Sequence, residues 1–216
     1  MILGSLFDIP LLIMHRLSPL IVCFFSLFVF QLNAQTKVVG ECTISYDIQQ
    51  ITSTGDTTSI GQKIVFIKGN SCKTILKTSE FTQTLIFNTQ KDSAIIIKEI
   101  GMNKLLQYIP YDPLNSAGLV ASKKTDSIST ILDYSCESIN LSWADGTSME
   151  VVYTTSIIPT VTVYEQAFKE IPGLVLSYQI TSKKGERILY KATKIDLSPI
   201  TLNVFEVNKA QYQIIN

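Results

Sequence analysis

Apolar and polar residues alternate along most of the chain, and this period of two constrains the fold more than any other feature. Successive side chains of a strand point to opposite faces of a sheet, so the pattern predicts half-buried β-strands. The stretches 43–48, 138–143 and 174–180 show it most clearly. Turn residues separate such stretches by roughly 8 to 12 residues, which predicts about nine to eleven strands in a sandwich or barrel.

The connections between these stretches carry recognisable turn signals. Asp145 and Gly146 lie between two alternating runs and predict a tight antiparallel hairpin. A helical pattern is confined to 163–170 and stops before Pro172 and Gly173, which we expect to form a structural turn. We expect Gly173 to use backbone angles that other residues avoid. No repeat or linker divides the chain, so the pattern favours one β-rich domain with one short helix.

The stretch around residue 64 is apolar on both sides. Alternation of Ile64 and Phe66 against Lys63 predicts that the two apolar residues face the core and that the lysine faces solvent. Val65 and Ile67 are apolar as well, which is typical of a strand that is covered on both faces.

The first 34 residues are typical of a secretory signal peptide. His15 and Arg16 precede the apolar run Leu17–Phe30, and the small Ala34 stands at the expected cleavage point. The run is shorter than the roughly 18 apolar residues of a retained anchor. Asp8 is unusual in a leader, which favours Met14 as the true start.

We therefore expect the mature domain, residues 35–216, to be exported to the periplasm, the outer membrane or the medium. After cleavage we expect no membrane span. An uncleaved anchor and lipidation at Cys23 are the alternatives that the leader leaves open.

The mature chain is short of catalytic chemistry. His15 is the only histidine, so the mature domain lacks the imidazole of Ser-His-Asp, Cys-His and most catalytic zinc sites. The 18 basic and 18 acidic residues balance, and without a basic stripe we expect no nucleic-acid binding. We expect no cofactor, no metal site and no enzyme activity. Carboxylate pairs keep a hydrolase open as the third hypothesis: Asp126 with Asp133, Asp145 with Glu150, or Glu165 with Glu170.

Three cysteines remain after cleavage, and an exported compartment permits disulfides. Cys42 and Cys72 lie in strands that are close in sequence, so we predict a bridge between them, with Cys136 free and buried. Pairing of Cys136 with either of the other two stays open, because spacing alone does not determine connectivity.

Several short motifs occur in a fixed order along the chain. They are Gly40–Tyr46, Ile131–Cys136, Ala144–Thr147, Val152–Thr155, Ile171–Tyr178 and Ala192–Asp196. This ordered set resembles the uncharacterised exported GLPGLI-type proteins of Gram-negative bacteria and a neighbouring domain of unknown function. The resemblance implies a fold similar to the lipoprotein carriers (LolA/LolB-like), an antiparallel sheet curved into an incomplete barrel around an apolar cavity. It brings no catalytic residues.

The leading functional hypothesis is a non-enzymatic envelope protein that holds a lipid or acyl chain in the concave face of this half-barrel. It is motivated by an apolar content of 46% in a chain of half-exposed strands. The expected lining consists of aromatic residues and one methionine: Tyr46, Phe66, Phe87, Trp143, Met149, Tyr153 and Tyr178. The alternative is a structural or protein-interaction module of the envelope with a packed core and no ligand.

Overall fold

The computed structural model describes residues 36–52, 54–112 and 118–215, and one large antiparallel sheet dominates it. Residues Thr36–Asn216 group into one compact unit. The expected signal peptide, residues 1–34, and the expected start at Met14 lie outside the described residues.

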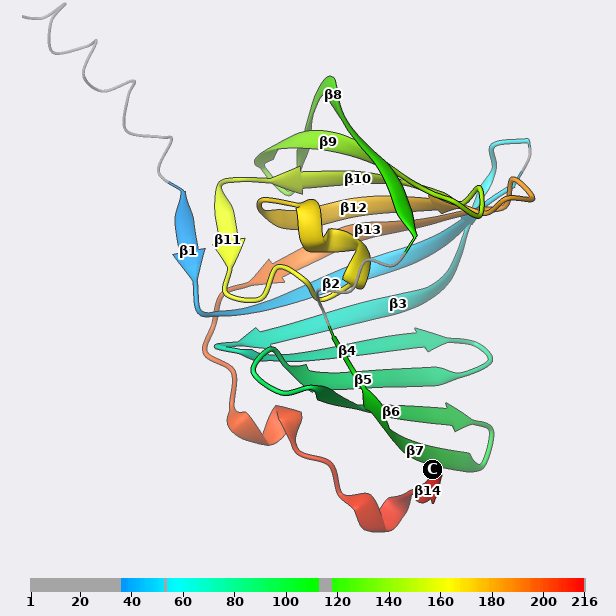
Figure 1. The fold of residues 1–216 in the computed structure, drawn as a ribbon, viewed down its shortest axis with the longest axis vertical. Coiled ribbons are helices and arrows are strands. Elements are labelled where there is room, and N and C mark those ends of the chain that lie inside the picture. Colours follow the sequence, from blue (N-terminus) through cyan, green and yellow to red (C-terminus); the bar gives the residue numbers. More distant parts are fainter. Residues whose placement is uncertain (1–35, 53, 113–117, 216) are drawn as a thin grey trace, which may run out of the picture. The chain divides into compact units, whose positions relative to one another are not determined.

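The main sheet has twelve strands in the order β14-β7-β6-β5-β4-β3-β2-β13-β12-β10-β9-β8. Their bounds are β2 (Glu41–Ile51), β3 (Thr57–Lys68), β4 (Ser71–Thr78), β5 (Thr82–Asn88), β6 (Ser93–Ile100), β7 (Asn103–Pro110), β8 (Leu119–Ile131), β9 (Tyr134–Trp143), β10 (Ser148–Thr154), β12 (Leu174–Thr181), β13 (Arg187–Asp196) and β14 (Gln213–Ile215). Neighbours are antiparallel, except that β14 runs parallel to β7. Among the described strands, β8 and β14 end the order, so the sheet curves without closing (Figure 1).

The predicted all-β class with a curved, incomplete barrel and one short helix is confirmed. The described part contains 14 strands, more than the nine to eleven expected. Three of them have three residues each, too few to show alternation: β14, β1 (Lys37–Val39) and β11 (Ile157–Pro159). Strands β1 and β11 form a separate parallel pair.

Within residues 36–52, 54–112 and 118–215, the helical elements are short 3-10 turns. The predicted helix is η1 (Gln166–Glu170), and η2 (Leu202–Phe205) and η3 (Lys209–Gln211) follow β13. In the part of the chain that the structure describes, none of the helices has the length and apolar character needed to cross a membrane.

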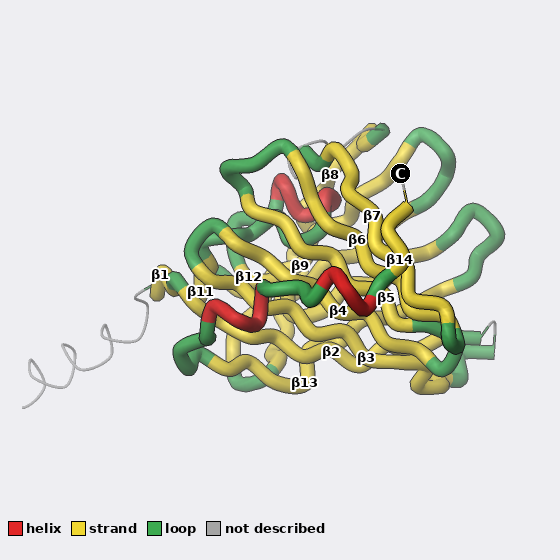
Figure 2. The backbone as a smooth tube through the Cα atoms, turned by 90° about the horizontal axis from the view of Figure 1, so that it is seen from below, coloured by secondary structure: helices red, strands yellow, loops and turns green. Residues whose placement is uncertain are grey.

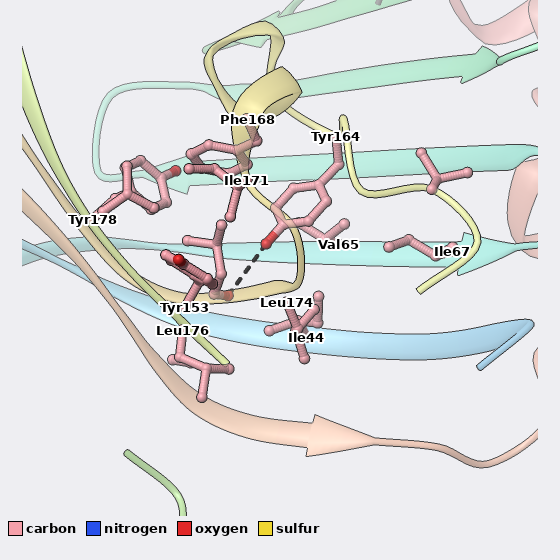
Figure 3. Close-up of a cluster of buried hydrophobic side chains, with 14 of the residues drawn as sticks. Ile44, Val65, Ile67, Tyr153, Tyr164, Phe168, Ile171, Leu174, Leu176 and Tyr178 are labelled. Atoms are coloured by element: carbon pink, nitrogen blue, oxygen red, sulfur yellow. Dashed lines mark hydrogen bonds between the residues drawn. The ribbon is translucent and has the colours of Figure 1, made fainter. Parts of the chain in front are cut away.

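The concave face of the sheet carries the core. Alternate residues of β2, from Cys42 to Ile48, are buried there. Residues 155–173, which we call the inner segment, connect β10 to β12 and pack onto the same core (Figure 1). The buried hydrophobic side chains that it contributes include Ile157 and Val161, and Tyr164, Phe168 and Ile171, which Figure 3 labels.

The convex face is crossed by the last part of the chain. After β13 the chain passes over the sheet through η2 and η3 and brings β14 beside β7 (Figure 2). Lys73 of β4 points to this side, and its ammonium donates a 2.7 Å hydrogen bond to the carbonyl oxygen of Val204. The two faces of the sheet are therefore covered by different segments of the same chain.

The inner segment ends where two backbones come close together. A Cβ on Gly173 would lie 2.1 Å from the carbonyl oxygen of Thr154. The sequence had suggested that Gly173 adopts unusual backbone angles. Its φ is not in the left-handed region, so the position needs glycine because there is no room for a side chain. Thr154 pairs with Leu174 at the end of the β10–β12 ladder.

The β9–β10 connection has the hairpin geometry that its sequence suggests. Gly146 has a φ of 85°, in the region that favours glycine. The carboxylate of Asp145 accepts a 2.9 Å hydrogen bond from the backbone N–H of Thr147, which is the local bonding that makes aspartate common in turns.

The predicted Cys42–Cys72 bridge is wrong. Both cysteines, and Cys136, are free and buried in the described structure. Cys42 pairs with Ile67 and Ile67 pairs with Cys72, so β3 lies between the two cysteines. Neighbouring strands are about 4.8 Å apart, which puts the two Cα atoms well beyond the roughly 7 Å limit for a disulfide.

Candidate functional site

Lys63 is buried in the core of the concave face, with only 2% of its side chain exposed. The expectation that Ile64 and Phe66 face the core is therefore wrong. Lys63 pairs with Tyr46 across β2 and with Leu76 across β4, and these pairings set which side of β3 faces inward. Because β3 is apolar on both faces, the alternation could not show which face it is.

The Lys63 ammonium is enclosed by one carboxylate and several aromatic rings. It donates hydrogen bonds to Glu165 and, at 2.8 Å, to the hydroxyl of Tyr178. Four tyrosine rings lie 5.2 to 5.8 Å from the nitrogen, close enough for cation–π attraction: Tyr46, Tyr164, Tyr178 and Tyr190. We call Lys63, Glu165 and these four tyrosines the lysine cage.

The tyrosines of the lysine cage are neutral. Burial raises the pKa of Tyr46, Tyr164 and Tyr178 above the ordinary value, and burial also raises the pKa of Tyr190. Their hydroxyls can bond to the ammonium or to one another but cannot balance its charge. Within the cage, Glu165 is therefore the group that supplies the negative charge.

Two of these tyrosines also fix the inner segment to the sheet. The hydroxyls of Tyr46 and Tyr164 lie 2.8 Å apart. Each also lies within hydrogen-bonding distance of the carbonyl oxygen of Val175, at 2.8 and 3.2 Å. The ring of Phe168 packs edge-on against Tyr164 and Tyr178, with centroids 5.1 and 5.2 Å apart. Figure 3 shows these rings from the inner segment facing the strands.

Glu165 is the accessible half of the ion pair. It precedes η1 with an extended backbone, at φ −129° and ψ 139°. Its side chain is 41% exposed, whereas that of Lys63 is 2% exposed. Glu165 was expected to pair with Glu170 as a second carboxylate. Its ion pair with Lys63 was not predicted, because the lysine was expected to face solvent.

A pocket of about 360 Å³ lies on the concave face, at the end of the sheet that carries the β2–β3, β4–β5 and β12–β13 turns. Ile48 and Gln50 of β2 stand opposite Tyr190 and Ile188 of β13, so strand pairing explains why the four side chains share this face. The full lining is Ile48, Gln50, Ile60, Leu76, Thr78, Ser79, Glu80, Phe81, Ile188 and Tyr190.

Tyr190 belongs both to the pocket lining and to the lysine cage. Its ring stacks on that of Tyr178, with centroids 4.3 Å apart and planes 5° from parallel. Its centroid is 5.6 Å from the Lys63 nitrogen. Leu76, another lining residue, stands directly opposite Lys63 in the β3–β4 pairing. The pocket and the cage are thus adjacent parts of one site.

The seven residues expected to line a ligand cavity have other positions. Phe66 pairs with Thr43 and Lys73 and so lies on the convex face, which corrects the expectation for that residue. The remaining six pack in or against the core of the concave face: Tyr46, Phe87, Trp143, Met149, Tyr153 and Tyr178. All seven are described residues, and the lining of the 360 Å³ pocket includes none of them. Tyr46 and Tyr178 instead form part of the lysine cage.

Three of the acidic residues considered for hydrolysis lie in three different settings. Asp133 is in the β8–β9 turn with a φ of 65°, and Asp145 is in the β9–β10 turn. Glu165 is paired with Lys63. The pocket lining described above includes one carboxylate, that of Glu80.

Comparison with protein-family models gave no match, and comparison with curated proteins gave none either. Among solved structures, the chain is similar to the structure of PNGF-II in the P21 space group, with 14% sequence identity and a TM-score of 0.50. The similarity covers 80% of this chain and 31% of that chain. At this identity the likeness shows a shared fold and nothing about activity.

Proposed function

We propose that the protein is an exported, non-enzymatic envelope protein that binds a hydrophobic ligand, a lipid or acyl chain, in the pocket of the concave face. The observation that supports this most is the pocket itself. Its volume of about 360 Å³ falls in the range of small-molecule sites, roughly 300 to 1,000 Å³, and its lining combines apolar side chains with a few polar ones.

The position of the pocket also supports the proposal. The inner segment covers other parts of the concave face with its own apolar side chains, including Tyr164 and Phe168. At the end of the sheet with the β2–β3 and β4–β5 turns, the apolar side chains of Ile60, Leu76 and Phe81 are only partly buried. Apolar surface left open in a concavity is what a hydrophobic ligand would cover.

Filling the pocket tests the proposal. We expect Leu76→Trp to abolish binding of a fluorescent acyl probe, because the indole would occupy the space of the ligand. Ile86→Trp is the matched control: Ile86 pairs with Lys73, so it lies on the convex face, and its variant should bind the probe like the wild type. Equal binding by both variants would place the probe outside the pocket.

The resemblance to exported GLPGLI-type proteins, with their LolA/LolB-like fold, is part of the same proposal. Together with the expected leader, residues 1–34, it supports a mature protein that begins near Gln35 and works in the periplasm, at the outer membrane or in the medium. Sequencing the N-terminus of protein recovered from cells tests the export step. Native mass spectrometry of the same material tests for a lipid that copurifies.

A structural or protein-interaction module of the envelope is the second candidate. It is favoured by the β6–β7 hairpin, where Met102 is 99% exposed and Ile100 is half exposed. Under this reading the core is complete without a ligand. Failure of the wild type to bind the probe, together with an unchanged melting temperature in the presence of acyl ligands, would support it over a carrier.

A further inference from the structure

We propose that the ligand of the concave pocket is an amphiphile with a carboxylate head group, and that this carboxylate replaces the side chain of Glu165 on Lys63. The inference rests on the proposed function, because it assigns the head group of the ligand that the pocket is proposed to hold. It names long-chain or medium-chain carboxylic acids as the ligand class.

Lys63 requires a negative charge beside its ammonium. A buried ammonium without a counter-charge is strongly unfavourable, and only 2% of the Lys63 side chain is exposed. The surrounding tyrosines stay neutral because burial raises their pKa values. One carboxylate is therefore needed beside Lys63, but it can come from Glu165 or from a ligand.

Glu165 and Lys63 differ in how easily each can move away from the ion pair. Glu165 lies on the inner segment, outside the strands, and its side chain is 41% exposed. Its carboxylate can turn into water without losing solvation. Lys63 is held inside the sheet by strand pairing to Tyr46 and Leu76. In an exchange, the glutamate leaves and the lysine stays.

The pocket lies close to the lysine cage. The Tyr190 ring lines the pocket and lies 5.6 Å from the Lys63 nitrogen. An acyl chain that lies against Leu76 and Tyr190 would end beside the ring that contacts the ammonium. Arginine would hold a carboxylate with two parallel bonds; a lysine hydrogen-bonded to Tyr178 offers a single point of contact.

The two ends of the pocket lie near side chains of opposite charge. Glu80 lies in the β4–β5 turn, at the outer end of the lining, and Lys63 lies beyond its inner end. A negative head group is repelled by the first and attracted by the second. The electrostatics thus favour a bound orientation with the head group at Lys63 and the apolar tail toward the turns.

Binding of dodecanoate and dodecanol to the full mature protein, measured by calorimetry, tests the inference. We expect the wild type to bind dodecanoate only slightly more tightly than dodecanol, because the charge-assisted hydrogen bond that the ligand gains at Lys63 replaces the one that Glu165 gives up. Lys63→Met should bind the two equally. Glu165→Gln, which removes the competing carboxylate, should bind dodecanoate about tenfold more tightly than the wild type does and leave dodecanol binding unchanged.

The matched controls are Lys68→Met and Glu41→Gln. They change the same charges in a second lysine–glutamate pair, at the other end of β3, and should leave both affinities unchanged. Because Glu165→Gln and the wild type are compared directly, the test stands even if Lys63→Met fails to fold.

The outcomes separate the two proposals. Binding of dodecanoate and dodecanol with equal affinity by the wild type, with no gain in Glu165→Gln, overturns the carboxylate assignment and leaves the apolar pocket in place. Tighter binding of dodecyl phosphate than of dodecanoate also overturns it, in favour of a phosphate head group. Failure of the wild type to bind any of the three overturns the proposed function and this inference together.

Discussion

Lys63 and Lys68 lie five positions apart on β3, and each forms an ion pair with a glutamate, yet the two lysines differ in exposure and in where their partners come from. Lys68 is 25% exposed and its partner Glu41 is 32% exposed. Glu41 stands directly across from Lys68 in the β2–β3 pairing, with 2.6 Å between nitrogen and oxygen. Lys63 is buried, and its partner comes from the inner segment, 102 residues away in sequence.

The difference shows that an ion pair can serve two purposes on one strand. The Lys68–Glu41 pair joins neighbouring strands that are already hydrogen-bonded, and a pair in which water reaches both partners contributes little to stability. The Lys63–Glu165 pair joins the sheet to a segment that covers it and neutralises a charge inside the core. We expect changes near Lys63 to have large effects and changes near Lys68 to have small ones.

The largest effect should come from the packing around the inner pair. Phe168→Ala removes a side chain with no exposed surface that contacts Tyr164 and Tyr178. We expect a loss of about 3–5 kcal/mol in the free energy of unfolding, the usual range for a buried phenylalanine, measured by urea denaturation. Leu202→Ala, at a residue that is 69% exposed, should change it by less than about 0.5 kcal/mol. A similar loss in the two variants would show that the inner segment is not part of the core.

The next effect should come from removing the counter-charge of Lys63. Breaking a fully buried ion pair costs about 3–5 kcal/mol, and because Glu165 is partly solvated we expect Glu165→Gln to lose only about 1–2 kcal/mol. Lys63→Met combined with Glu165→Gln should recover most of this loss, since it removes the uncompensated charge. A double variant less stable than Glu165→Gln would mean that the lysine stabilises the fold through its ring contacts.

A smaller effect is expected at the outer pair. Lys68→Met should destabilise the protein less than Glu165→Gln does in the same urea experiment, because water and salt screen the exposed charges. Raising the salt concentration should reduce its effect further. If Lys68→Met were the more damaging variant, the contrast between the two pairs would be lost.

The smallest effect is a dependence on pH. The hydrogen bond from Lys68 lowers the pKa of Glu41 below its ordinary value of 4.5. A carboxyl with a lower pKa in the folded state stabilises the fold above its unfolded pKa, and this contribution is lost as the pH falls through the folded value. Glu41→Gln should therefore lose slightly less stability than the wild type between neutral and acidic pH, measured by thermal melting. An identical pH profile would contradict the assigned cause.

Alternation, clearest in β2, was enough to predict an all-β antiparallel domain, and the resemblance to the GLPGLI-type proteins supplied the curved, incomplete barrel. The sequence was also enough for the short helix near η1. It could not place β3, whose two faces are both apolar and whose direction depends on pairing with β2 and β4. The error at Phe66 follows from that ambiguity.

The candidate site was out of reach for a related reason. A lysine is normally a solvent residue, and nothing near Lys63 in sequence announces a partner, since Glu165 belongs to a segment that folds back from a distant part of the chain. The cysteine pairing failed similarly, because sequence spacing does not show that β3 separates Cys42 from Cys72. Long-range register determines both features.

The close approach of Gly173 to Thr154 has a consequence for how this protein can vary. Residues 155–173 leave the sheet and rejoin it at the same position of the ladder, because Thr154 and Leu174 pair with each other. A stretch of another length can therefore join β10 to β12 with the pairing of these two strands unchanged, whereas the pairing of β11 with β1 would change with it. Such an exchange would alter what covers the concave face and leave the twelve-stranded sheet as the common frame.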